Sequence, residues 1–176
     1  MSGSTVLAFA VSHAGQTVGR GECYDLAHEA LRSGGDRSAP DYGSVGARDD
    51  YTWGRPISEG ELQPGDIIQF QTHQVRVEVT RRRGSTVLDT SSETATRNHH
   101  TVIVAQVHAR GRITVYEQNF QGIRSVQRND LWLDGGTTVN REPQDSGEPI
   151  EVTTVVTRTG TWHCYRPQAP AGAFVP

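Results

Sequence analysis

The sequence lacks the features that define several specialised classes of protein. It has two cysteines in 176 residues, too few for a disulfide scaffold, although Cys23 and Cys164 could pair. It has no run of roughly 18 apolar residues that would span a membrane. It also has no lysine, and we ascribe this to compositional bias. The formal net charge of −3 gives no basis for general affinity for nucleic acid.

Length and composition indicate one folded domain. The chain has a mass of 19.3 kDa, which falls within the usual size of a single domain. A globule of this size buries roughly 70% of its unfolded surface, so it needs neither a disulfide nor a metal to hold a core. The N-terminal MSGSTVLAFAVSHAG has no basic residue before its apolar stretch. It therefore does not fit a secretory signal, and the compartment stays open.

The first part of the chain contains the clearest helix. Residues 4–12 are expected to form a short helix or strand. Residues 23–33 carry apolar side chains at the spacing of one buried helical stripe, and Gly34 and Gly35 end this helix. Residues 34–50 are rich in glycine, serine, aspartate and proline, which predicts a loop. The stripe consists of Cys23, Leu26, Ala27, Ala30 and Leu31.

After the loop the pattern changes to strands. A Pro-Gly-Asp turn precedes a short apolar strand at 67–70, and VRVEVT leads through a turn at Arg82–Gly84 into a hairpin. The three arginines at 81–83 are expected in a solvated turn, with an anion site as the alternative. Residues 101–107 (TVIVAQV) predict a central strand buried on both faces. Further strands are expected at 113–118 and, more weakly, at 123–127, 150–158 and 161–166.

One helical segment followed by antiparallel strands predicts an α+β fold. We expect a sheet of about five or six strands, with the helix that carries Cys23 packed on one face. Residues 1–166 would form a single domain, and residues 167–176 would form a loosely held tail.

Cys23 is a candidate nucleophile because of its place at the start of a helix. The unpaired N–H groups of a first helical turn carry partial positive charge, which favours thiolate over thiol. The Gly-Arg-Gly segment before it, residues 19–21, would let a substrate backbone approach closely. The alternative is that Cys23 is a small core residue.

A thiol nucleophile needs a base, and seven histidines compete for that role. His99 and His100 begin the most apolar strand, where only one of them can face the thiol. A third group normally orients the imidazole. Glu117 and Asn119 share one face of the next strand and are candidates, unless they only mark a strand end in water. Nothing in the sequence has the spacing of a metal site.

The order of these segments resembles a known family. GRGECYDLA, YTWG, LQPGDIIQF, HHTVIV and VYEQN follow one another as in the CHAP domain, the cysteine, histidine-dependent amidohydrolase/peptidase family. The chain is similar more distantly to NlpC-type cell-wall peptidases, and both have the papain-like fold. The resemblance covers about residues 5–120 and leaves the region after 123 without guidance.

The resemblance implies a role for each matched residue. The family nucleophile falls on Cys23, the histidine before the apolar run on His100, and the acidic and amide positions on Glu117 and Asn119. Gln16 stands close to where papain-like enzymes place a glutamine that donates to the oxyanion. Trp53 would line the cleft or belong to the core.

Together these residues predict a thiol hydrolase that cleaves an amide bond through a thioester, without a cofactor or metal. The resemblance implies a peptide or peptidoglycan substrate. The alternatives are an inactive peptide- or glycan-binding module, and an effector or toxin acting as a deamidase or transferase. A toxin would have a small immunity protein as its partner. The sequence does not determine the oligomeric state.

Overall fold

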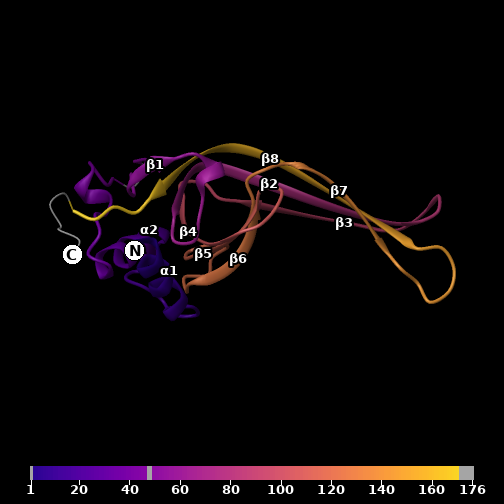
Figure 1. Cartoon of the computed structure of the whole chain (residues 1–176), viewed down its shortest axis with the longest axis horizontal. Coiled ribbons are helices and arrows are strands. Elements are labelled where there is room, and N and C mark those ends of the chain that lie inside the picture. Colours follow the sequence, from indigo (N-terminus) through magenta and orange to yellow (C-terminus); the bar gives the residue numbers. More distant parts are fainter. Residues whose placement is uncertain (1, 47–48, 171–176) are drawn as a thin grey trace.

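A computed structural model describes residues 2–46 and 49–170 of the chain. Two helices pack against one face of a long antiparallel sheet (Figure 1). The helices are α1 (Ser2–Ser12) and α2 (Cys23–Ser33). The strands are β1 (Arg55–Ile57), β2 (Ile67–Arg83), β3 (Thr86–Thr96), β4 (His100–Val107), β5 (Arg112–Glu117), β6 (Gln127–Trp132), β7 (Gly136–Glu142) and β8 (Ile150–Arg166).

The helix predicted at residues 23–33 is confirmed with those bounds as α2. Leu26, Ala27, Ala30 and Leu31 of its predicted stripe are buried, and α2 packs against α1 and β4. The segment at 4–12, for which helix and strand were both open, is helical as part of α1. Within the predicted loop at 34–50, the described residues, 34–46 and 49–50, are irregular apart from one short 3₁₀ turn at Ala39–Asp41.

The sheet is larger than predicted. Over the described residues it has eight strands, in the order β1-β8-β2-β4-β5-β6 with β3 beside β2 and β7 beside β8. The expected five or six strands were too few because β1 and β7 have no apolar alternation. The segments at 150–158 and 161–166, expected as separate strands, belong to one strand, β8. The weak strand expected at 123–127 was also misplaced, since β6 begins at Gln127.

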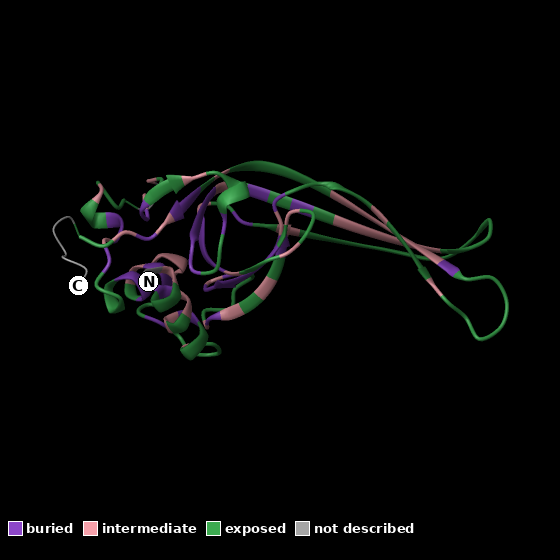
Figure 2. Cartoon of the chain, in the orientation of Figure 1, coloured by how far each residue is buried: buried purple, intermediate pink, exposed green. Residues whose placement is uncertain are grey.

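Four strands continue beyond the core as a projecting arm (Figure 1). We define the arm as residues 74–96 and 136–159, a sheet in the order β3-β2-β8-β7. Figure 2 shows that its residues are mostly exposed or half-buried. The predicted turn at Arg82–Gly84 begins later than expected, because β2 continues to Arg83. Arg81 lies within β2 and forms an ion pair with Glu142.

The core lies on both faces of the sheet. The side chains of Ile67 and Ile103 join the two helices in one apolar cluster. Val102, Val104 and other apolar residues form a second cluster on the opposite face. The strand at 101–107 is thus buried on both faces over its first residues, as predicted, and becomes exposed only toward Val107. This burial fixes the position of His100 at the start of β4.

The predicted tail is partly attached to the domain. The backbone N–H of Arg37 donates to the carbonyl of Gln168 at 2.8 Å. Residues 171–176 lie outside the described residues. Within the described part of the chain, neither helix has the length and apolar character needed to cross a membrane.

Candidate active site

Cys23 is the first residue of α2, directly after a tight loop at residues 18–22. The carboxylate of Asp25 accepts hydrogen bonds from the backbone N–H groups of Arg20 (2.8 Å) and Glu22 (3.2 Å). Gly19 has a φ of +57°, and a Cβ there would lie 2.8 Å from the Cβ of Asp25. Glycine is therefore required at this position so that the loop can fold over Asp25.

Gln118 holds this loop against the end of β5. Its Oε1 accepts from the N–H of Val18 at 2.8 Å, and its Nε2 donates to the carbonyls of Val18 (3.0 Å) and Glu22 (2.8 Å). The side chain is fully buried. No sequence pattern marks Gln118, because a single buried amide has no periodicity to reveal it. Its three hydrogen bonds place the start of α2 beside the strand that carries Glu117.

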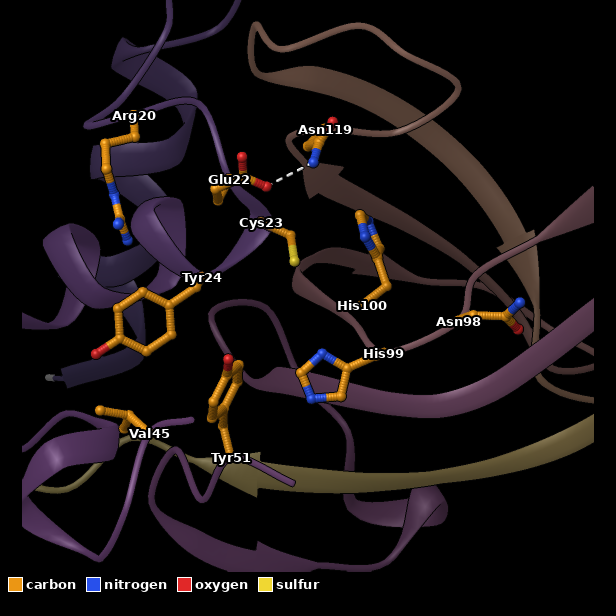
Figure 3. A pocket seen from close by; sticks show the side chains of 10 residues that line it. All are labelled: Arg20, Glu22, Cys23, Tyr24, Val45, Tyr51, Asn98, His99, His100 and Asn119. Carbon is orange, nitrogen blue, oxygen red and sulfur yellow. Dashed lines mark hydrogen bonds between the residues drawn. The ribbon is translucent and has the colours of Figure 1, made fainter. Parts of the chain in front are cut away.

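His100 lies between Cys23 and Glu117. Its Nε2 is 3.0 Å from Oε2 of Glu117, and the same imidazole hydrogen-bonds the thiol of Cys23. Because Nε2 of His100 contacts Glu117, the ring nitrogen left to contact the thiol is Nδ1. Figure 3 shows the Cys23 side chain extending toward the His100 ring across the pocket. The three residues come from α2, β4 and the end of β5.

The electrostatics of this arrangement favour a thiolate paired with an imidazolium. Burial raises the pKa of Cys23, but the hydrogen bond and positive charge of His100 outweigh it, so the pKa lies below its ordinary value. Burial lowers the pKa of His100, but hydrogen bonds with Cys23 and Glu117 raise it to about 9. Both shifts favour a proton on the imidazole rather than on the sulfur.

Two further residues, Arg97 and Asn129, hold Glu117 through hydrogen bonds. Arg97 donates to it through Nε (2.9 Å) and Nη2 (2.7 Å), and Asn129 donates through Nδ2 (2.9 Å). Burial raises the pKa of Glu117, but hydrogen bonds with His100 and Arg97 lower it to about 2. Arg97 follows the end of β3 and lies in no periodic segment, so no sequence pattern marks it.

Cys23 and His100 line a pocket of about 680 Å³ that opens to solvent, whereas Glu117 is fully buried outside its lining. Tyr24, Val45, Tyr51 and His99 lie on one side of Cys23, and Glu22 and Asn119 lie on the other (Figure 3). One side of the pocket is thus aromatic and apolar, and the other is polar. The lining residues are Arg20, Glu22, Cys23, Tyr24, Val45, Tyr51, Asn98, His99, His100 and Asn119.

Residues 1–135 match the family model described as the AIM3/BBC1 cysteine proteinase-fold domain. The chain belongs to this family. Membership supports the papain-like fold that the sequence predicted, but it does not single out the CHAP or NlpC-type peptidases. The matched residues include Cys23, His100, Glu117 and Arg97 and exclude β7 and β8.

Other comparisons add little to the family assignment. The chain is similar to a solved structure described as "The crystal structure of Ly7917", with 21% sequence identity and a TM-score of 0.47. That match covers 95% of this chain and 82% of the other. A likeness at this level carries no argument about function. No curated protein matches the chain.

Two of the residues expected at the site of this family member lie elsewhere. Gln16 is exposed, its Nε2 donates to the carbonyl of Ser12 at 3.2 Å, and it does not line the pocket. The expectation was wrong because the chain turns between Gln16 and the loop at 18–22. Trp53 is fully buried, and its Nε1 donates to Gln69 at 3.0 Å. It belongs to the core rather than to the pocket lining.

The sequence left two choices open, between Glu117 and Asn119 and between His99 and His100, and the two members of each pair make different contacts. Asn119 lines the pocket, but its Nδ2 donates to Oε2 of Glu22 at 2.6 Å, whereas Glu117 is the residue that contacts His100. His99 also lines the pocket, and its Nε2 donates to the carbonyl of Asp49. His99 has a φ of +46°, which lets two successive histidines border one cleft.

Cys164 has a different environment from Cys23. It is buried in β8 within the apolar cluster opposite the helices, as expected for a core thiol. Burial raises its pKa to about 12. Both cysteines are free. Among the described residues, no three histidine, cysteine or acidic side chains are grouped as a metal site.

Proposed function

We propose that the chain is a thiol-dependent amide hydrolase in which Cys23, His100 and Glu117 act in sequence. The observation that carries the proposal is the single imidazole that contacts both Cys23 and Glu117 at the edge of a solvent-open pocket. A nucleophile, a base and an orienting carboxylate in this order make up a thiol hydrolase site.

The geometry supports the following sequence of steps. The thiolate of Cys23 attacks the amide carbonyl carbon, and the C–N bond breaks as the imidazolium of His100 protonates the leaving amine. This leaves the acyl group on sulfur as a thioester and His100 neutral. His100 then takes a proton from water as the water attacks the thioester. The C–S bond then breaks and the carboxylic acid leaves, which restores the thiolate of Cys23 beside the imidazolium of His100.

Glu117 and the start of α2 would support these steps. Glu117 fixes the ring so that Nδ1 faces the sulfur, and its negative charge stabilises the imidazolium. The backbone N–H of Cys23 lies in the first turn of α2, where it can donate to the developing oxyanion. With Gln16 outside the pocket, the second donor is not the side chain that the family resemblance implied.

For the substrate, we propose a peptide or peptidoglycan amide. The resemblance to CHAP and NlpC-type peptidases favours peptidoglycan. The pocket, with an aromatic side and a polar side around Cys23, is compatible with an extended peptide. A deamidase or a transferase would use the same thioester and differ in whether ammonia leaves or an amine accepts the acyl group.

The first experiment measures alkylation of the two cysteines by iodoacetamide at about pH 6, below the ordinary thiol pKa of about 8.5. Cys23 should be labelled while Cys164 is not, so Cys164 serves as an internal control. His100→Ala should abolish the difference. Equal labelling of both cysteines, rising only near that ordinary thiol pKa, would instead support a binding module without turnover.

The second experiment identifies the bond. Purified wall fragments are digested with the full chain and with Cys23→Ala, and the released ends are identified by mass spectrometry. New ends that depend on Cys23 define the amide that is cleaved. If Cys23 is reactive but no fragment is cleaved, protein substrates should be tested for deamidation. A small protein that blocks alkylation of Cys23 would indicate a toxin with an immunity partner.

A further inference from the structure

The arm takes no part in the proposed site, and one of its edges is open. Among the described strands, β3 pairs only with β2, so its other edge faces solvent. Ten of its eleven residues are exposed, and Ala95 is half-buried. Alternate backbone N–H and C=O groups along such an edge have no strand partner, and they form a template on which another strand can add.

β3 lacks most of the features that normally prevent such addition. Sheet edges are usually protected by short strands, proline, bulges, or charged side chains, lysine above all. Of these features β3 has one bulge beside Asp89 and two carboxylates. β3 is eleven residues long, contains no proline or basic residue, and is rich in threonine and serine. The opposite edge of the arm, β7, has seven residues, begins with Gly136 and ends with Arg141 and Glu142. The edge of β3 is therefore the better template of the two.

The charges of β3 disfavour a second copy of this chain as the added strand. Asp89 and Glu93 are four residues apart and lie on the same face of the strand. If two copies of β3 paired antiparallel over their full length, the pair would be centred on Ser91. Asp89 of each copy would then lie opposite Glu93 of the other, which makes two pairs of like charges. Like charges directly opposite each other destabilise a strand pair. The same two carboxylates would stabilise a basic strand.

A small cavity beside Glu93 and Ala95 of β3 also favours a basic side chain. Its volume is about 150 Å³. Most of its lining residues are apolar, and the exposed residues Glu93 and Asp130 add two carboxylates to the lining. Arg97 also lines it but is committed to Glu117. Arginine and lysine combine an apolar stem with a charged head, as this cavity requires. The lining residues are Val75, Val77, Glu93, Ala95, Arg97, Asp130, Leu131 and Trp132.

We propose that the outer edge of β3 binds an extended strand of a partner protein that carries basic side chains four positions apart. One basic side chain lies opposite Asp89. The other lies opposite Glu93 and extends into the cavity between Glu93 and Asp130. This interaction surface is independent of the Cys23 site.

The test uses two fluorescent nine-residue peptides of alternating threonine and valine. One carries two arginines four positions apart, and the other carries glutamates at the same places. By fluorescence polarisation, the full chain should bind the arginine peptide about tenfold more tightly, since opposite charges replace like charges at two cross-strand positions. Hydrogen exchange on the unmodified chain should show that the arginine peptide protects amides within residues 86–96.

Two variants with the same change in net charge provide the control. Glu93→Arg should remove most of the preference for the arginine peptide. Glu148→Arg, in the loop between β7 and β8, should preserve it. The proposal is overturned if both variants lose the preference equally, if residues 86–96 gain no protection, or if the chain forms a dimer through β3 without peptide. Alkylation of Cys23 should be unchanged in both variants, so failure here leaves the hydrolase proposal intact.

Discussion

Arg97 and Glu117 form a two-pronged ion pair in which the side chains are 2% and 0% exposed. Arg97 also lies with its guanidinium 4.0 Å from the ring centre of Phe120. Glu117 in turn contacts His100, and His100 contacts Cys23. Arg97, Glu117, His100 and Cys23 thus form a row of alternating charge from the interior to the pocket. Each charge in this row depends on its neighbours, because a buried charge without a partner is strongly destabilising.

Glu117→Gln should reduce the reactivity of Cys23. Glutamine keeps a polar group beside Nε2 but loses the negative charge, so the pKa of His100 falls and that of Cys23 rises. We expect alkylation of Cys23 at about pH 6 to slow at least about tenfold, which corresponds to a rise of about one in its pKa. Asn119→Ala is the matched control, because Asn119 lines the pocket without contacting His100. A larger effect of Asn119→Ala would assign the orienting role to Asn119.

Arg97→Met should move the acid limb of the pH profile of alkylation. Arg97 lowers the pKa of Glu117, so its removal lets Glu117 take up a proton at a higher pH. His100 then loses its anionic partner, and we expect the acid limb to move toward neutrality by about one pH unit or more. The measurement is the alkylation rate of Cys23 from about pH 3 to about pH 7, a range that spans the ordinary pKa values of glutamate and histidine.

Arg97→Lys separates charge from geometry in the same experiment. Lysine restores the positive charge but not the planar fork, so it should return the acid limb only part of the way. An acid limb that stays in place in Arg97→Met, in protein that remains folded by circular dichroism, would show that Arg97 supports the fold without acting through Glu117.

Gln118→Leu should loosen the loop before Cys23. The change leaves the N–H of Val18 and two carbonyls without their buried partner, which costs about 1–3 kcal/mol of the free energy of unfolding. Alkylation of Cys23 should slow as well, because the start of α2 is no longer fixed to β5. Gln16→Ala should change neither quantity, since Gln16 is exposed. Urea unfolding and alkylation of both variants check this, and equal effects would contradict it.

His73 should make the protein less stable in acid. It is fully buried, its Nε2 contacts the carbonyl of Trp132 at 3.0 Å, and burial lowers its pKa to about 4. Between an unfolded pKa of about 6.5 and this folded value, only the unfolded chain binds the proton. Stability is therefore lost as the pH falls from about 6.5 to about 4, by about 3 kcal/mol in total.

The variant His73→Phe tests this dependence, since it keeps an aromatic ring against Phe70 and Trp162. Urea unfolding at several pH values should show a shallower loss of stability in the variant over this range. Parallel curves for the two proteins would assign the acid sensitivity to other groups.

Features that depend on neighbouring residues could be predicted from the amino-acid order alone. The spacing of apolar side chains in residues 23–33 defined α2 with its bounds and put Cys23 in the first turn. The continuous apolar run after His100 defined β4, and a separate alternation identified β5 with Glu117 at its end. Helical and strand periodicity are local properties, so these elements can be recognised in a short window.

The contacts between these elements were settled by the folding of the whole chain. β4 is apolar on both faces, so its pattern could not show whether His99 or His100 meets the thiol. The alternation placed Glu117 and Asn119 on one strand face, but β5 ends at Glu117 and Asn119 has a φ of +58°, so only the tertiary structure shows that Glu117 contacts His100. Arg97 contacts Glu117 and Gln118 contacts Val18, and both partners are too distant in sequence for a periodic pattern to connect them. The sequence predicted the hairpin of β2 and β3 and a strand at 150–158, but it did not predict β7 or the joining of these strands into an arm, because that joining depends on pairing across the sheet rather than on a local pattern.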